Sequence, residues 1–252
     1  MKLLIKLSYL GTDFCGYQVQ NGKRTVQGCL TEAARTLFTY DCDITGCSRT
    51  DSGVHANMFC ATISKKGESG LTTRLSPDRI ILALNAHLPD DIHVWDAEWV
   101  DDDFHARYGV KYKEYIYRIC TGGAKMPFMR NRAMIYYKQL DDCAVENMNR
   151  AAQAFLGEHD FSAFMAQGSK FVSTVRCVKY ARVEKCDGEI IFTVAADGFL
   201  YNMVRIMAGT LIAVGEGKIK CEDIEKIILS CDRKNAGQTA PPDGLYLNKV
   251  EY

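Results

Sequence analysis

The sequence lacks the marks of several common protein classes. Its 252 residues contain no apolar run long enough to cross a bilayer. The apolar start is interrupted at once by Lys6, so we expect a first strand there rather than an export signal. No Cys-x-x-Cys or His-x-x-x-His pattern is present to hold zinc. We therefore expect neither a membrane segment nor a metal site.

Phosphate and dinucleotide motifs are missing as well. The stretch Gly215–Lys218 resembles a Walker loop, but Ile212 stands where that loop needs glycine, and Ile219 where it needs Ser or Thr. No Gly-x-Gly-x-x-Gly opens a helix after a strand. The sequence therefore implies no cofactor.

Net charge is also absent, because 31 basic residues balance 31 acidic ones. Many nucleic-acid-binding proteins are basic, so this balance argues weakly against such a partner, although clustering of charge matters more than its sum. Eleven cysteines are present, an odd number, and Cys29, Cys60, Cys120 and Cys177 fall singly inside apolar segments. We expect small buried thiols in a reducing cytoplasm rather than a disulfide framework.

The residues that are present describe a globular α+β protein, with 47% apolar and 25% charged residues. The patterns predict two similar α+β domains, 1–103 and 104–252, each an antiparallel or mixed sheet with helices packed on one face. The expected strands are 2–10, 42–45, 57–64, 92–100, 111–120, 134–138, 172–185, 189–196 and 244–250. The expected helices begin at or near Thr25, Pro77, Asp141, Leu200 and Glu222.

One polar loop, Gly46–Ala56, concentrates reactive side chains between two predicted strands. It carries Arg49, Asp51 and His55. Loops between strands are frequent positions for functional residues. The same residues also suit an ordinary turn built on Asp51 and Gly53, so composition alone leaves both interpretations open.

Three other segments place polar residues inside strongly structured elements. Phe104–Arg107 opens the second half, Tyr115 and Tyr117 share one face of a strand, and Arg205 lies in the most apolar helix. A buried arginine is costly unless it meets an anion, so a carboxylate partner is the sharper hypothesis. A snorkelling side chain is the simpler one.

Taken in order, these segments resemble the tRNA pseudouridine synthases of the TruA type over nearly the whole chain. The matching motifs lie in 9–18, 25–27, 46–56, 85–89, 104–107, 115–117, 157–161, 199–209 and 244–247. Two residues depart from the family pattern: Ser48 stands where glycine is usual, and Ser52 replaces a common alanine.

The resemblance implies the pseudouridine synthase fold, with two domains joined around a central catalytic cleft. It also implies a redox-neutral isomerisation that needs neither metal nor cofactor. Asp51 is the implied nucleophile, and Arg205 its implied charge partner, favouring the ionised carboxylate. Tyr115 would stack on the displaced uracil and its hydroxyl would be placed to move a proton, while Arg49 would hold the flipped nucleotide. Whether Asp51 attacks C1′ or C6, or acts through a glycal, stays open.

The implied substrate is the tRNA anticodon stem-loop, at uridines 38 to 40 of the tRNA, bound by a homodimer. The expected RNA-binding residues are Arg49, Phe104, His105, Ala106, Arg107, Tyr108, Tyr115, Lys170, Arg176 and Leu245, with Val204 as a second apolar wall. A basic surface would be formed by Arg49, Arg107, Lys111, Lys113, Arg118, Arg130, Arg132, Lys170, Arg176 and Arg205.

Three alternatives remain at this point. The chain would be a pseudouridine synthase with a different RNA target, a relative that binds RNA without catalysis, or a hydrolase that uses Asp51 and His55 as an acid–base pair. The intact segment Arg49–Asp51 and Tyr115 argue against the second.

Overall fold

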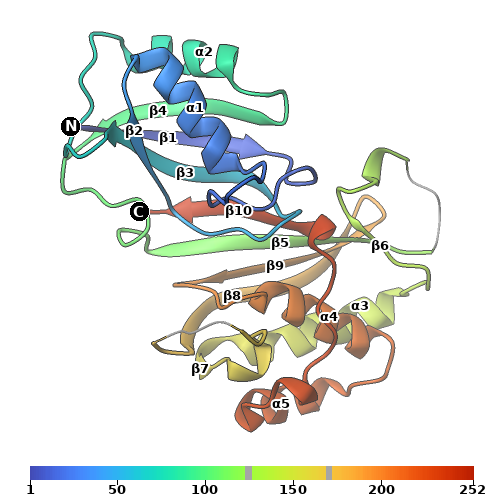
Figure 1. Cartoon of the computed structure of the whole chain (residues 1–252). Coiled ribbons are helices and arrows are strands. Elements are labelled where there is room, and N and C mark those ends of the chain that lie inside the picture. The colour runs from blue at the N-terminus through green and yellow to red at the C-terminus, as the bar shows by residue number, and fades with distance from the viewer. Residues whose placement is uncertain (123–126, 169–171) are drawn as a thin grey trace. The chain divides into compact units, whose positions relative to one another are not determined.

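The chain forms two compact units in the computed structural model, which describes residues 1–122, 127–168 and 172–252. Unit 1 comprises Met1–Lys111 together with Leu247–Tyr252, and unit 2 comprises Tyr112–Tyr246 (Figure 1). The first unit thus continues past Asp103, where the sequence suggested a boundary, and regains the end of the chain. The composition of the last strand carries no signal for this return.

Unit 1 is a sheet with two helices on one face (Figure 1). Its strands follow the order β4-β1-β3-β10, and β2 pairs with β3. The pairs β1–β3, β1–β4 and β2–β3 are antiparallel. The elements are β1 (Lys2–Tyr9), α1 (Val26–Phe38), β2 (Cys42–Gly46), β3 (His55–Lys65), α2 (Pro77–His87), β4 (Ile92–Val100) and β10 (Leu245–Glu251).

The order of elements predicted for the first half, β-α-β-β-α-β, is confirmed. Thr25 caps α1 by accepting a hydrogen bond from the Gly28 amide at 3.2 Å, as its position before an apolar-periodic segment indicates. Pro77 occupies the first turn of α2, where its missing N–H costs nothing. Ser76 is the N-cap residue of α2, although its side chain makes no capping hydrogen bond.

The strands of unit 2 follow the order β5-β9-β8-β7, and the short β6 pairs in parallel with β5. The predicted hairpin is confirmed: β8 and β9 meet at Asp187 and Gly188, whose φ angles of +50° and +82° suit a tight hairpin turn. The elements are β5 (Tyr112–Cys120), β6 (Met134–Ile135), α3 (Asp142–Ala152), β7 (Gly157–Asp160), β8 (Val175–Cys186), β9 (Glu189–Ala196), α4 (Met203–Gly215) and α5 (Ile224–Ser230).

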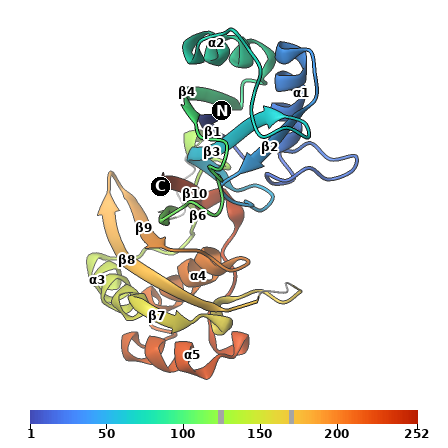
Figure 2. The same cartoon turned by 90° about the vertical axis from the view of Figure 1, so that its left-hand side faces the viewer.

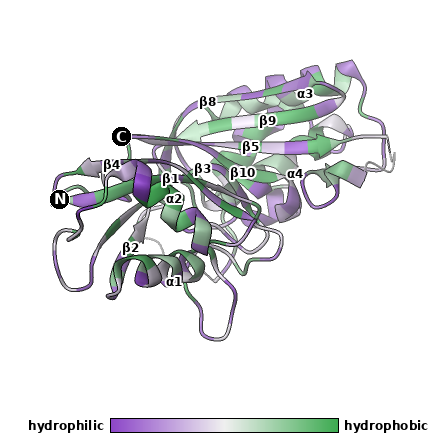
Figure 3. Ribbon diagram, turned by 90° about the horizontal axis from the view of Figure 1, so that it is seen from above, coloured by the Kyte–Doolittle hydropathy of each residue, from purple (hydrophilic) through white to green (hydrophobic). Residues whose placement is uncertain are grey.

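Helices α3 and α4 pack against each other, and α3 also contacts β8 (Figure 2). Asp141 caps α3 by accepting from the Ala144 amide at 2.8 Å. Helix α4 begins at Met203, later than the apolar pattern predicts, because Asn202 has a φ of +60° and breaks the helix there. The strand β7 was not predicted, since its sequence is short and polar. Strand β9 is mainly hydrophobic (Figure 3) and is largely buried.

The cysteines are all free thiols. Cys60 and Cys120 are buried as predicted, whereas Cys29 and Cys177 are half-buried. In the described part of the chain, every helix is too short or too polar to span a bilayer.

Candidate active-site segments

The loop that carries Asp51 connects β2 to β3 in unit 1. Asp51 is half-buried and Arg49 is exposed. The turn closes when the Val54 amide donates to the Asp51 carbonyl at 3.2 Å. Gly53 has a φ of +80°, a conformation that favours glycine. A glycine at this position therefore lets the chain reverse directly after Asp51.

A second segment, residues 10–17, is hydrogen-bonded to this loop. The Tyr17 amide donates to the Thr50 carbonyl at 3.2 Å. The Phe14 carbonyl accepts from the Ser52 hydroxyl at 3.2 Å and from the Gly53 amide at 3.3 Å. Hydrogen bonds thus join the two segments both before and after Asp51. Residues 9–18 form one of the family motifs found in the sequence, but no role was predicted for them.

Tyr17 anchors the supporting segment in the core. Its ring stacks on Phe59 of β3 at 4.3 Å between centroids. Burial raises the pKa of its phenol well above the ordinary value, and the nearby Arg107 guanidinium opposes that rise. The Tyr17 hydroxyl and the Arg107 Nε are buried without a hydrogen-bond partner among the described residues. Arg107 therefore lies beside the support of the Asp51 loop, within the same unit.

The predicted RNA-binding segment Phe104–Tyr108 is a compact turn. The His105 Nδ1 accepts from the amides of Arg107 at 3.1 Å and Tyr108 at 3.2 Å. Ala106 is fully buried, and its carbonyl accepts from the Tyr252 hydroxyl at 2.8 Å. Tyr108 is 80% exposed, so its ring is accessible for stacking. Ala106 is thus a packing residue rather than a contact surface.

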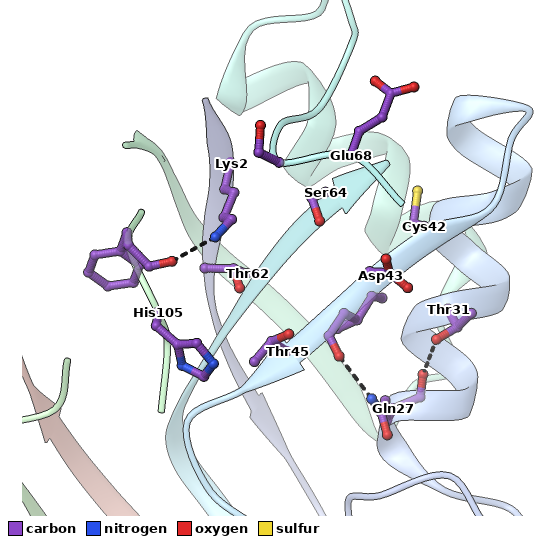
Figure 4. A pocket seen from close by; sticks show the side chains of 13 residues that line it. Lys2, Gln27, Thr31, Cys42, Asp43, Thr45, Thr62, Ser64, Glu68 and His105 are labelled. Atoms are coloured by element: carbon purple, nitrogen blue, oxygen red, sulfur yellow. Dashed lines mark hydrogen bonds between the residues drawn. The ribbon is translucent and has the colours of Figure 1, made fainter. Parts of the chain in front are cut away.

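Two residues of this segment line a polar pocket of about 520 Å³ in unit 1 (Figure 4). Phe104 and His105 form one wall, and Lys2 donates to the Phe104 carbonyl at 3.0 Å (Figure 4). The remaining lining residues are Gln27, Thr31, Cys42, Asp43, Ile44, Thr45, Thr62, Ser64, Glu68 and Ser69. No residue of the Asp51 loop reaches this pocket, and Asp43 and Glu68 give it acidic character. Phe104 and His105 thus line a pocket whose lining residues do not include Asp51.

In unit 2, Tyr115 and Tyr117 lie on one face of β5, as predicted. Tyr115 is 6% exposed and meets the edge of Phe199 with 5.0 Å between ring centroids. Tyr117 is fully buried and donates its hydroxyl to the Pro241 carbonyl at 2.7 Å. Burial raises the pKa of Tyr117 far above its ordinary value. Tyr117 is thus a structural residue.

Arg205 lies in the first turn of α4 and is half-buried. Its Nε donates to the Ala240 carbonyl at 2.7 Å, and its Nη1 donates to the Asn202 Oδ1 at 2.8 Å. The Ala240 amide donates back to the Arg205 carbonyl at 3.1 Å. Arg205 therefore fastens the chain before β10 to the start of α4. Val204 and Leu245, the residues predicted to form the apolar pocket wall, are both buried.

Several cations of the predicted basic surface have other partners. Arg118 forms an ion pair with Glu189, which competes with its predicted place on a phosphate-binding surface. Arg176 donates to the Ser173 carbonyl at 3.0 Å, and Lys111 donates to the Tyr252 carbonyl at 2.7 Å. Lys170 lies outside the described residues. Arg49 is exposed and remains the strongest candidate for an RNA contact.

His55, the acid–base partner of Asp51 in the hydrolase alternative, lies at the start of β3. Its side chain is fully buried and its Nδ1 accepts from the Gly11 amide at 2.9 Å. In residues 1–122, 127–168 and 172–252, no three His, Cys, Asp or Glu side chains gather to hold a metal ion.

Comparison with known proteins gives full-length matches. The family model described as tRNA pseudouridine synthase matches residues 6–109 and 151–252. Proteins called tRNA pseudouridine synthase A from Clostridium botulinum and Acetivibrio thermocellus are each 44% identical over 253 residues, which covers 100% of this chain and 99% of theirs. One from Thermoanaerobacter sp. is 43% identical over 250 residues, covering 99% of each chain. The segment of Tyr115 falls outside the family model but inside these full-length matches.

Proposed function

The chain belongs to the tRNA pseudouridine synthase family, and we propose that Asp51 is the nucleophile with which it isomerises uridine to pseudouridine in tRNA. It is thus an RNA-modifying isomerase. The observation that supports Asp51 is its place: a half-buried carboxylate at a turn that hydrogen bonds hold on both sides. Such fixed placement is what a nucleophile needs.

The reaction breaks the bond between uracil N1 and ribose C1′, turns the base and forms a bond from C5 to C1′. A proton is lost from C5 and one is gained at N1, so no oxidant, reductant or phosphate donor enters the balance. Asp51 supplies a carboxylate that forms a covalent adduct and later leaves. We keep the attacked atom open between C1′ and C6, and elimination through a glycal is the third route.

Two residues of unit 2 complete the proposal. Tyr115 stacks on the flipped uracil, and its hydroxyl is assigned to proton transfer. The edge contact with Phe199 holds the Tyr115 ring in place. Arg205 supplies the positive charge that favours the ionised form of Asp51. Both assignments follow the family resemblance.

The proposed substrate segment is the anticodon stem-loop, at uridines 38 to 40, bound by a homodimer in the cytoplasm. The names of the full-length relatives support tRNA as the substrate. The exposed guanidinium of Arg49, two residues before Asp51, is suited to hold the flipped nucleotide. Leu245 and Val204 form the proposed apolar wall.

The deciding experiment is incubation with unmodified tRNA transcripts, followed by mapping of pseudouridine. We expect product at positions 38 to 40 with the wild-type chain and none with Asp51→Asn or Asp51→Ala, while tRNA binding persists. Asp90→Asn, which alters an exposed carboxylate of the same unit, is the matched control and should retain activity. Product formation by Asp51→Ala would overturn the nucleophile, and product at other uridines would overturn the site assignment.

A further inference from the structure

Two buried side-chain hydrogen bonds flank Asp51. Before it, the Thr50 Oγ1 and the Tyr9 hydroxyl lie 2.8 Å apart. After it, the His55 Nδ1 accepts from the Gly11 amide at 2.9 Å. Both bonds reach the same short stretch of chain, where β1 ends. The chain before and after Asp51 is therefore hydrogen-bonded to one supporting stretch, residues 9–11.

The backbone of the supporting segment packs closely against the backbone of the Asp51 loop. A Cβ at Gly11 would lie 1.9 Å from the Val54 carbonyl oxygen, and a Cβ at Gly16 would lie 2.6 Å from that of Thr50. Only glycine allows so near an approach. A displacement of the support would therefore be transmitted to the backbone on either side of Asp51.

The chemistry of the His55 bond fixes the state of its ring. A backbone amide can only donate, so the His55 Nδ1 must present a lone pair. The ring proton therefore sits on Nε2, and the imidazole is neutral. Tyr9 and His55 are 4% and 0% exposed, so water does not compete for either bond.

We propose that Tyr9 and His55 are positioning residues for Asp51. This inference rests on the proposed role of Asp51 as nucleophile. Covalent catalysis requires the attacking oxygen within a fraction of an ångström of its productive place. Tyr9 sets the residue before Asp51, and His55 sets the strand that follows it. Neither touches the substrate in this role, so both act through the carboxylate that they hold.

The Tyr9 arm is tested by Tyr9→Phe, which deletes one hydroxyl. Tyr40→Phe is the matched control, because the Tyr40 hydroxyl donates to the Thr72 carbonyl at 2.7 Å elsewhere in unit 1. We expect single-turnover pseudouridine formation to fall about tenfold or more for Tyr9→Phe at unchanged tRNA affinity, since small displacements of a reacting group have this effect. Tyr40→Phe should keep its rate. Equal rates in the two variants would overturn the proposal.

The His55 arm is tested by a pair of amides. In His55→Asn the Oδ1 takes the place of Nδ1 and can accept from Gly11, whereas the longer His55→Gln places its amide where Nε2 was. We expect His55→Asn to retain most of the wild-type single-turnover rate and the slow exchange of the Gly11 amide hydrogen. His55→Gln should lose both the rate and the slow exchange. The same loss in both variants would overturn the role of the Nδ1 bond.

The two proposals fail in different ways. Full activity of Asp51→Asn would remove the nucleophile, whatever Tyr9 and His55 do. An inactive Asp51→Asn beside a fully active Tyr9→Phe would leave the nucleophile in place and remove only the positioning role. Amide exchange in the free protein reports the support without reference to either reaction step.

Discussion

Arg118 and Glu189 form a two-point ion pair in unit 2, with Nε to Oε2 and Nη2 to Oε1 both at 2.8 Å. The two side chains lie on adjacent strands, β5 and β9, and the Glu189 side chain is only 11% exposed. The pair raises the pKa of Arg118 through its hydrogen bonds to the carboxylate. The pair engages the Nε and Nη2 donors of Arg118, which leaves fewer donors for an RNA phosphate.

Arg118→Ala is therefore expected to lower stability and to spare RNA binding. Loss of the partner leaves a nearly buried carboxylate unpaired, which we expect to lower the free energy of unfolding by about 2–3 kcal/mol. Chemical denaturation measures this change. The dependence of tRNA affinity on salt should match that of the wild type, and the double variant with Glu189→Gln should recover part of the stability. A weaker salt dependence in Arg118→Ala would return this residue to the RNA-binding surface.

Arg49→Ala, in contrast to Arg118→Ala, is expected to weaken RNA binding and to leave stability unchanged. Arg49 is exposed, so its removal should leave the unfolding transition unchanged. If it contacts one phosphate, the slope of log affinity against log salt should fall by about 1. Binding measured at several salt concentrations gives the slope. An unaltered slope with full activity would exclude Arg49 from the interface.

Arg205→Ala is expected to reduce both stability and the chemical step. The loss of the bonds to Ala240 and Asn202 should lower the free energy of unfolding by about 1–3 kcal/mol. Asn202→Ala removes one of these bonds but keeps the guanidinium, and so separates the two effects. We expect Asn202→Ala to lose stability with most of its single-turnover rate intact. Equal rates in the two variants would contradict the electrostatic role of Arg205.

Tyr115→Phe tests whether the phenol does more than stack. The ring and its edge contact with Phe199 remain, so the fold and tRNA affinity should be unchanged. We expect the single-turnover rate to fall about a hundredfold, within the range typical of general acid–base catalysis. Tyr117→Phe is a control for stability, because its hydroxyl serves Pro241. A fully active Tyr115→Phe would limit the residue to stacking.

Acid stability should depend on Glu216. Hydrogen bonds from Lys138, Lys218 and Tyr136 lower its pKa from 4.5 to about 2. A depressed pKa stabilises the fold above pH 4.5, and this contribution disappears as the pH falls toward 2. Glu216→Gln should lower the free energy of unfolding at pH 7 by about 1 kcal/mol, because the lysines are exposed. The difference from the wild type should vanish near pH 2; Glu225→Gln, an exposed carboxylate, should show no such convergence.

Local patterns predicted most elements of the fold. The caps of α1 and α3 and the Asp187–Gly188 turn are set by residues next to them in sequence, so they are readable from it. The start of α4 was misplaced because Asn202 adopts a left-handed backbone that apolar spacing does not reveal. Strand β7 was missed since its pairing with β8, and not its own polar residues, makes it a strand.

The candidate site was predictable in its residues but not in their surroundings. The Asp51 loop and Tyr115 stood out as motifs. The Arg118–Glu189 pair joins residues far apart in sequence, and nothing local distinguishes Arg118 from an RNA-binding arginine. The support formed by Tyr9 and Gly11 was equally hidden, because it depends on which strand ends beside the loop.

The return of the last strand to unit 1 has a consequence for synthesis on the ribosome. Lys111 donates its amide to the Glu251 carbonyl at 2.8 Å, and Tyr252 bonds to Ala106. The unit that holds Asp51 therefore stays incomplete until residues 247–252 have been translated and have left the exit tunnel. Unit 2, made in one uninterrupted stretch, is free to fold earlier. A nascent chain that stalls before Leu245 would carry every residue of the Asp51 loop without β10, the strand that pairs beside β3.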